Sequence, residues 1–260
     1  MATRSRRPSF AALALCGGLA LGLAGAAYGD SNALWNIVHH WCVPNEEQHG
    51  DPAPCRLVVV SGGEQRGYAL LKDLVGGAQF LLIPTARIPG IESPALLAAG
   101  TPNYFAAAWR SRTYVEQALH RTLPREDLSL AVNSVYGRSQ NQLHIHVDCV
   151  RADVRDTLRS GEGAVGDRWA PLGSLLAGHR YLAMRVTGED LGLVNPFTAL
   201  ADGVPGARAD MGRHTLVVVG ATFPGGTPGF ILLDDRADPA AGNPGSGEEL
   251  QDHACAVARP

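Results

Sequence analysis

The stretch Ser139–Val150, SQNQLHIHVDCV, constrains the fold more tightly than any other part of the chain. Successive side chains of a β-strand point to opposite faces of a sheet, so this row separates into two sets. The apolar set predicts a buried face and consists of Leu143, Ile145 and Val147. The other face carries Gln142, His144, His146 and Asp148, at steps of about 7 Å. A solvated strand face more often carries Thr, Lys, Arg or Glu, so this polar row predicts a chemical role.

Strands and helices alternate along the rest of the chain. The patterns predict an N-terminal helix from Ser31 to about Trp41 and a further helix that starts at Thr101-Pro102. Predicted strands have apolar runs bounded by turn residues. They are 55–61, a hairpin of 67–72 with 79–84, 127–134, 141–150, 180–186, and a hairpin of 214–223 with 229–235. We also expect helices within 151–161, 188–204 and 248–257. This arrangement predicts an α+β fold, an antiparallel sheet with flanking helices.

The chain could contain a degenerate internal duplication. The order strand, helix, strand, strand occurs from Gln79 to Cys149 and again after residue 165, where FILLDD takes the place of LHIHVD without its histidines. We expect residues 1–29 to be a signal or membrane-anchor segment and residues 30–260 to be one domain. Within that domain, 30–160 would be the half that carries the histidine row and 161–260 the degenerate repeat.

The N-terminus predicts export. A basic start is followed by an uncharged run from Pro8 to Gly29, rich in Ala, Leu and Gly. The run is about the shortest that can span a bilayer, so both cleavage and retention as an anchor stay open. Residues 30–260 carry 19 basic and 25 acidic side chains, a net charge of −6. Nucleic-acid binding needs a basic face, so that class is disfavoured.

Export makes disulfides permissible, and four cysteines follow the leader region. Four cysteines allow three pairings. We favour Cys42–Cys55, which closes a short loop, together with Cys149–Cys255, which ties the histidine strand to the C-terminus.

Two kinds of chemistry compete for the histidine row. The pattern H-x-H-x-D resembles the opening of the metallo-β-lactamase zinc signature, in which a further histidine stands where this chain has Cys149. The second interpretation is a histidine nucleophile. Asn133 lies eleven residues before His144 and Gln140 lies four before it, a layout that resembles the histidine-triad (HIT) nucleotide hydrolases and transferases. The third histidine of that triad is replaced by Asp148.

Further motifs narrow the resemblance. The segments ALWNIVHHWCVPN, GYALLKD, LLIPTARIPGIESP, NQLHIHVDC, GHRYLAMRV and QDHAC are together similar to the CDP-diacylglycerol pyrophosphatases, a family of the HIT-like superfamily. The match extends from Ala33 to Cys255. It implies a HIT-like fold and hydrolysis of CDP-diacylglycerol to CMP and phosphatidate. It also implies a bacterial inner-membrane enzyme with a single N-terminal span and a periplasmic catalytic domain.

The resemblance implies roles for particular residues. His146 maps to the nucleophile, which would form a cytidylyl-histidine intermediate. His144 would contact phosphate or share protons, and Asp148 would orient an imidazole or bind a ribose hydroxyl. Substrate-binding side chains would be Asn133, Gln140, Gln142 and Lys72, the last being the single lysine of the chain. HIT enzymes need no metal, so we expect neither metal nor cofactor; the expected partners are the lipid-linked nucleotide and the membrane.

Three alternatives stay open at this point. A broader nucleotide-diphosphate hydrolase or cytidylyl transferase would use the same histidine. A zinc-dependent hydrolase would use the HxHxD row and would lose activity with a chelator. A non-catalytic lipid- or nucleotide-binding module would bind its ligand without turnover.

Overall fold

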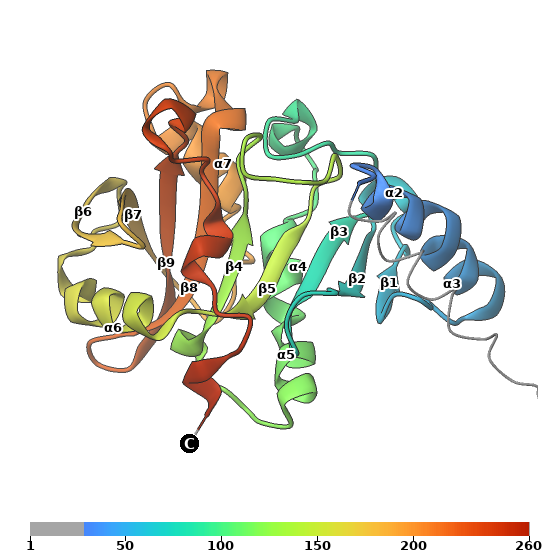
Figure 1. The fold of residues 1–260 in the computed structure, drawn as a ribbon, viewed down its shortest axis with the longest axis horizontal. Coiled ribbons are helices and arrows are strands. Elements are labelled where there is room, and N and C mark those ends of the chain that lie inside the picture. Colours follow the sequence, from blue (N-terminus) through green and yellow to red (C-terminus); the bar gives the residue numbers. More distant parts are fainter. Residues whose placement is uncertain (1–28, 260) are drawn as a thin grey trace, which may run out of the picture.

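Residues 29–259 are described by a computed structural model, so the predicted leader lies outside the described residues apart from Gly29. The described part forms one nine-stranded sheet in the order β1-β2-β3-β5-β4-β8-β9-β7-β6 (Figure 1). Every neighbouring pair is antiparallel. The predicted α+β class is therefore confirmed. The strands are β1 Leu57–Val59, β2 Tyr68–Lys72, β3 Phe80–Pro84, β4 Leu128–Val132, β5 Ile145–Cys149, β6 Ala170–Leu176, β7 His179–Thr187, β8 His214–Phe223 and β9 Thr227–Arg236.

Helices cover both faces of this sheet. A continuous N-terminal helix consists of α2 Ala33–Ile37, a π-helical turn Val38–Cys42 and α3 Val43–His49. The other α-helices are α4 Tyr104–Arg110, α5 Arg112–Leu119, α6 Ala152–Gly161 and α7 Pro196–Gly203. Within residues 29–259, no helix combines the length and the apolar character that a membrane crossing requires.

One face of the sheet is fully packed. The helices α4, α5 and α7 lie on it, and Ile145 and Val147 of β5 enter the same core. Trp109 belongs to this core and is 1% exposed. Apolar side chains of both layers exclude water from this face, which fixes the register of β5 and turns its polar row to the opposite side.

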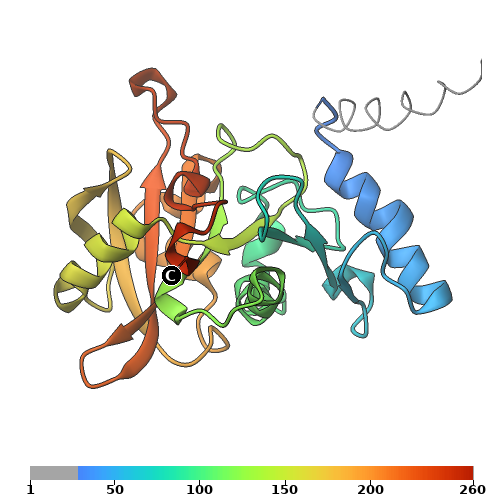
Figure 2. The same ribbon diagram turned by 60° about the horizontal axis from the view of Figure 1, so that its bottom comes forward.

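The opposite face has two separate covers. The α2–α3 helix packs on β1–β3 through Leu34 and Val38, which contact the cluster that contains Leu81. Helix α6 packs on β4, β8 and β9, in the cluster that contains Ala131. Leu81 and Ala131 are the two register partners of His146 in the neighbouring strands. Strand β5, whose polar face carries the histidine row, therefore lies between the two covers (Figure 1), and Figure 2 shows the same ribbon turned by 60°.

Several predicted boundaries differ from the structure. The helix expected at Thr101 begins at Tyr104, because Asn103 accepts a hydrogen bond from the Ala106 N–H as the cap. The helix expected over 188–204 is only α7, and the strand expected over 141–150 begins at Ile145. The helix expected over 248–257 is wrong: 247–250 and 256–258 are two short 3₁₀ turns. Strand β6 was not predicted, because most of its side chains are exposed and it lacks an apolar face.

The two halves of the sheet repeat one pairing order. In the first half β2 pairs with β3, β3 with β5 and β5 with β4. In the second half β6 pairs with β7, β7 with β9 and β9 with β8. The halves meet where β4 pairs with β8. The duplication stays a prediction, and this repeated order is the topology that a duplication would produce.

Candidate active site

A cavity of about 520 Å³ opens over the polar face of β5. Its polar end is formed by Lys72, Asp73, Asn133, Gln140, His144, His146 and Glu248. Its other end is formed by apolar side chains of α2 and of the β2–β3 hairpin, chiefly Leu34, Ile37, Leu71, Leu74, Val75 and Leu81. A concave site with an apolar wall and a few convergent polar groups suits a ligand that has both characters.

Both histidines of the row reach this cavity. His144 is 8% exposed and His146 is 4% exposed. Their ring centroids lie 4.8 Å apart and the rings are close to perpendicular, at 67°. His144 stands just before β5, while the ladder to β3 and β4 holds His146 in place.

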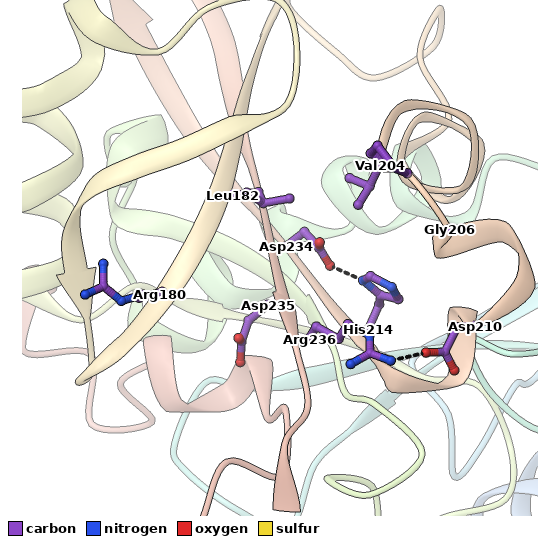
Figure 3. A pocket seen from close by; sticks show the side chains of 10 residues that line it. Arg180, Leu182, Val204, Gly206, Asp210, His214, Asp234, Asp235 and Arg236 are labelled. Carbon is purple, nitrogen blue, oxygen red and sulfur yellow. Dashed lines mark hydrogen bonds and ion pairs between the residues drawn. The ribbon is translucent and has the colours of Figure 1, made fainter. Parts of the chain in front are cut away.

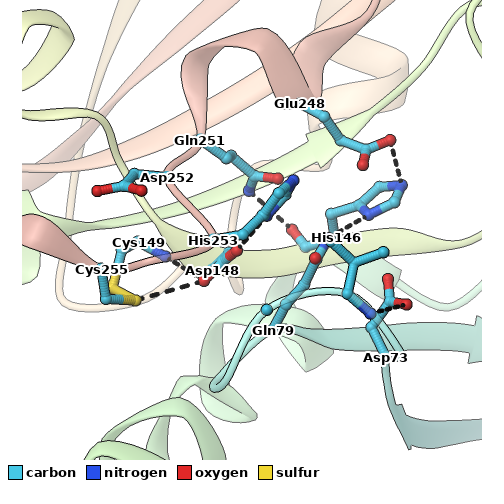
Figure 4. A network of polar contacts seen from close by, with 12 residues as sticks. Asp73, Gln79, His146, Asp148, Cys149, Glu248, Gln251, Asp252, His253 and Cys255 are labelled. Atoms are coloured by element: carbon cyan, nitrogen blue, oxygen red, sulfur yellow. Dashed lines mark hydrogen bonds and ion pairs between the residues drawn. A yellow bond between two sulfur atoms is a disulfide. The ribbon is translucent and has the colours of Figure 1, made fainter.

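The two ring nitrogens of His146 have different surroundings (Figure 4). Nδ1 lies 2.8 Å from Nε2 of Gln79, a buried amide at the start of β3. Nε2 of His146 lies 3.1 Å from Oε1 of Glu248, but it has no hydrogen-bond partner although it is buried. Buried polar atoms are usually hydrogen-bonded, so an unpaired one in a cavity is a candidate for contact with substrate.

The orientation of the Gln79 amide determines which tautomer of His146 is present. With Gln79 Nε2 donating to Nδ1, a neutral imidazole carries its proton on Nε2. Gln79 Oε1 is buried and unpaired in that orientation. Rotating the amide by a half turn places Oε1 at Nδ1, where it accepts an Nδ1–H and leaves the Nε2 lone pair free. Amide orientation is an assignment that the hydrogen-bond network decides, so both tautomers are available to this site.

The ring of His144 is held by a backbone carbonyl. Its Nδ1 donates to the backbone carbonyl of Gln142 at 2.8 Å, which leaves Nε2 as the free nitrogen of the neutral ring. His146 uses a side-chain amide for the same purpose. Each ring therefore has a hydrogen-bond partner at Nδ1 that can leave Nε2 free for attack.

Burial keeps both histidines neutral. Desolvation lowers the pKa of His144, although the bond to the Gln142 carbonyl opposes it. Desolvation is also the main reason why the pKa of His146 falls well below its ordinary value, and the nearby His144 and His253 lower it further. At neutral pH both rings are uncharged, the state that a nucleophilic nitrogen requires.

Three of the predicted binding residues lie at the cavity. Asn133 donates through Nδ2 to Glu248 Oε1 at 2.6 Å and accepts from the Gly247 N–H. Lys72 donates to the backbone carbonyls of Asp73 and Gly76. Gln140 spans 106 residues to accept from the Leu34 N–H, so it holds the start of α2 against the site. All three line the cavity.

Two other predicted residues do not line the cavity. Gln142 is fully buried, and its amide donates to the carbonyls of Pro84 and Ala86, so it joins the β5 approach to the end of β3. Asp148 is also fully buried; its Oδ2 lies 2.7 Å from Nδ1 of His253. Of its two expected roles, this contact fits the orientation of an imidazole, but the imidazole is His253 and not a histidine of the row.

Three residues of the site were not predicted. Gln79 precedes its strand, and Glu248 and His253 come more than 100 residues after the histidine row. The loop from Asn243 to Gln251 brings Glu248 over β4 and β5, where Gln251 Nε2 bonds to Ser129 Oγ at 3.1 Å. A signal for His253 was present in the QDHAC segment, whose cysteine forms one of the disulfides.

The HxHxD row does not gather as a metal centre. Within residues 29–259, two groups bring three ligand atoms within 4.8 Å of one another: Asp148 with Cys149 and Cys255, and His179 with Asp235 and Glu249. Neither group contains His144 or His146. The cysteines of the first group are joined in a disulfide, so their sulfurs are not thiolate ligands.

A second cavity, of about 530 Å³, lies in the other half of the sheet (Figure 3). His214 and Asp234 form a buried pair on it, with Nδ1 and Oδ1 2.8 Å apart. Arg236 pairs with Asp210 at the same cavity, at 2.5 Å. These groups satisfy one another, whereas His146 keeps an unpaired nitrogen. The cavity over β5 is therefore the candidate active site.

Comparison with known proteins identifies the family of this chain. The family model described as CDP-diacylglycerol pyrophosphatase matches residues 29–259, which include every residue of the cavity. A protein of Yersinia pestis named CDP-diacylglycerol pyrophosphatase is 41% identical over 230 residues, which cover 88% of this chain and 86% of that protein. A match of this extent and identity places the chain: it belongs to the CDP-diacylglycerol pyrophosphatase family.

Proposed function

We propose that this protein hydrolyses the pyrophosphate bond of CDP-diacylglycerol through a covalent intermediate on His146. Membership of the family supports the substrate and the reaction. One observation carries the choice of nucleophile: Nε2 of His146 is buried at the polar end of the cavity and has no hydrogen-bond partner. Strand β5 is paired on both sides, so the backbone that carries His146 is held in place for the attack.

The first step transfers the CMP group to the enzyme. The Nε2 lone pair attacks the phosphorus of the CMP half and forms an N–P bond. The bond from that phosphorus to the bridging oxygen breaks, and its electron pair leaves with phosphatidate. Gln79 Oε1 would accept the Nδ1–H during this step and so stabilise the charge that the ring acquires.

The second step releases CMP. Water attacks the phosphorus, the N–P bond breaks, and its electron pair returns to Nε2 of His146. Splitting one displacement into two in this way is the general advantage of covalent catalysis.

Glu248 and Asn133 bound the space where phosphate has to enter. Glu248 Oε1 is 3.1 Å from the attacking nitrogen and 2.6 Å from Asn133 Nδ2. A phosphate approaching Nε2 displaces this carboxylate, because two anions at that distance repel each other. Asn133 Nδ2 then donates to a phosphate oxygen, and Lys72 supplies a positive charge at the same end.

The apolar end of the cavity suits the lipid part of the substrate. Leu34 and Ile37 of α2 line it together with Leu74 and Val75 of the β2–β3 turn. Leu74 is 75% exposed, so this wall continues to the protein surface. We place the glycerol group and the first carbons of the acyl chains there, and the nucleotide at the polar end.

The working compartment is the oxidising side of the inner membrane. Both disulfides, Cys42–Cys55 and Cys149–Cys255, are present as predicted, and such bonds persist in exported proteins. The uncharged run of residues 8–29 precedes α2 directly and would hold the apolar end of the cavity near the bilayer.

Activity is expected without a metal ion. The purified, detergent-solubilised protein should release CMP from CDP-diacylglycerol at the same rate before and after treatment with EDTA, because the steps above use only side chains. The measurement is CMP release by chromatography, with phosphatidate as the matching product. Loss of activity in EDTA and its return with zinc would favour the metal alternative. Absence of CMP from folded, oxidised protein would remove the substrate assignment.

Substitution of Gln79 should lower kcat without changing KM by much. In Gln79→Leu, Nδ1 of His146 loses its partner, and we expect kcat to fall about 100-fold because the reactive tautomer is no longer selected. Gln79→Glu is the conservative variant. Its carboxylate would favour charged His146, raise the pKa of that ring, and move the acidic limb of the pH–rate profile to higher pH. Equal profiles for both variants would contradict this role.

A further inference from the structure

Asp148 occupies the place of the third triad histidine and uses both of its carboxylate oxygens in hydrogen bonds. Its carboxyl group is fully buried, with Oδ1 accepting from the Cys149 N–H at 2.8 Å and Oδ2 2.7 Å from Nδ1 of His253. Burial raises the pKa of this carboxyl group, and the bond to His253 works in the opposite direction. Burying a carboxylate is costly unless a hydrogen-bonded partner compensates, so the pair with His253 is the feature that makes Asp148 tolerable there.

His253 is held in one position from three sides. Asp148 binds its ring, and two residues later Cys255 is joined to Cys149 of β5. On the third side Gly76 of the β2–β3 turn packs so closely that a Cβ there would lie 2.9 Å from the Cβ of His253. The side chain is nevertheless 31% exposed, and its Nε2 is the nitrogen that Asp148 does not use.

His253 lies close enough to the active site for its charge to act on His146, although it is not among the residues that line the cavity. Figure 4 shows it between Asp148 and His146, below Glu248. The turn that packs on it, Asp73 to Gly76, supplies Asp73, Leu74 and Val75 to the wall of the cavity. Its charge is felt by the nucleophile, since charged His253 contributes to the low pKa of His146.

We propose that His253, oriented by Asp148, is the proton donor and acceptor of this active site. The proposal rests on the proposed function, because it assigns a role in the two steps at His146. The imidazole that a triad would place on β5 is supplied here by the C-terminal segment, and the aspartate at the third position is its anchor.

The proton balance of both steps follows from this arrangement. When His146 attacks and the P–O bond breaks, Nε2–H of His253 gives its proton to the departing phosphatidate oxygen. Asp148 keeps the proton on Nδ1, so the neutral ring has its lone pair on Nε2. That lone pair accepts a proton from water as water attacks the phosphorus and the N–P bond breaks. His253 is then charged again and His146 is free, so the cycle closes.

The groups around His253 suit it to the acid role. The pKa of His253 is raised, mainly by the hydrogen bond to Asp148, and the negative charges of Asp148, Glu248 and Asp73 add to this while partial burial opposes it. The pKa of His146 is lowered. Activity therefore falls as pH drops through the lowered value, where His146 becomes charged, and as pH rises through the raised value, where His253 loses its proton. Between the two, both groups are in the reactive state.

The test is the pH profile of kcat/KM for CDP-diacylglycerol. In Asp148→Asn the amide still accepts from Nδ1 but the charge is gone, so the basic limb should move to lower pH. In His253→Gln activity should fall about 100-fold and the basic limb should disappear. The exposed His49→Gln is the matched control and should keep both limbs in place. An unchanged basic limb in both Asp148→Asn and His253→Gln would overturn the proposal.

A second readout separates this proposal from the nucleophile. Rapid quenching with substrate labelled in the CMP phosphate should show that His253→Gln forms the covalent nucleotide slowly and then retains it, because the base for the second step is missing. Fast loss of the adduct in His253→Gln would overturn the role of His253 while leaving His146 intact. Absence of any adduct in the unmodified enzyme would instead overturn the proposed function. Circular dichroism and thermal melting confirm that each variant is folded.

Discussion

Replacing His146 with asparagine should lower kcat by about 10⁴-fold or more. The substitution removes the nitrogen that would form the N–P bond in the proposed mechanism. The asparagine amide can still bond to Gln79, so the strand and the cavity should keep their shape. The measurement is CMP release under single-turnover conditions, together with a thermal melt that shows the variant to be folded.

His144→Asn is the matched control for this effect. The two rings are 4.8 Å apart on one face, and both are buried and neutral, so the two variants perturb the site to a similar degree. We expect His144→Asn to lower kcat by about 100-fold, because in the proposed mechanism His144 would contact phosphate and would not be the nucleophile. The reverse order of the two effects would assign the nucleophile to His144, whose Nδ1 is held by a backbone carbonyl.

Removal of the Cys149–Cys255 disulfide should produce the largest loss of stability. The bond closes a loop across 106 residues of sequence. Cross-linking so long a loop lowers the entropy of the unfolded chain, which stabilises the folded state by about 4–5 kcal/mol. We therefore expect Cys149→Ala with Cys255→Ala to lower the free energy of unfolding by about that amount, as measured by urea denaturation. Activity should fall as well, because His253 and Glu248 lie on the segment that this bond fixes.

The Cys42–Cys55 bond is the internal comparison. It spans only 13 residues, for which the same argument gives about 3 kcal/mol, and it joins the N-terminal helix to the chain just before β1. Cys42→Ala with Cys55→Ala should therefore be the more stable of the two double variants and keep its pH profile. A pH profile that changes equally in both double variants would show that the C-terminal bond has no particular role at the site.

The sequence predicted the strand that carries the chemistry because its pattern is local. Alternation over Leu143–Asp148 requires one apolar and one polar face, and the structure buries Ile145 and Val147 on one side while His146 faces the cavity. The apolar hairpins and the two disulfides were also predictable, since β-strand pairs close in sequence and cysteine spacing are read directly from the chain. The joining of these hairpins in one nine-stranded sheet was not predictable from local patterns.

The residues that surround the histidines were not predictable for a physical reason. Glu248 reaches His146 across 102 positions and His253 reaches Asp148 across 105, so no local pattern reports these contacts. Gln142 and Asp148 lie on the polar face of the row, as alternation requires, but what covers each one decides its role. Asp148 meets His253, and Gln142 meets two backbone carbonyls, before either reaches the cavity. Gln142 and Asp148 differ from His144 and His146 in the residues that pack over them. A strand pattern carries no information about such tertiary contacts.

The most direct test of the account is to identify the residue that carries the nucleotide. Enzyme mixed with CDP-diacylglycerol labelled in the CMP phosphate would be quenched in alkali, which preserves a phosphoramidate, then digested and sequenced by mass spectrometry. The account predicts one cytidylyl group on His146, absent from His146→Asn and present in His144→Asn. A label on His144, or turnover by an enzyme that never carries the label, would contradict it.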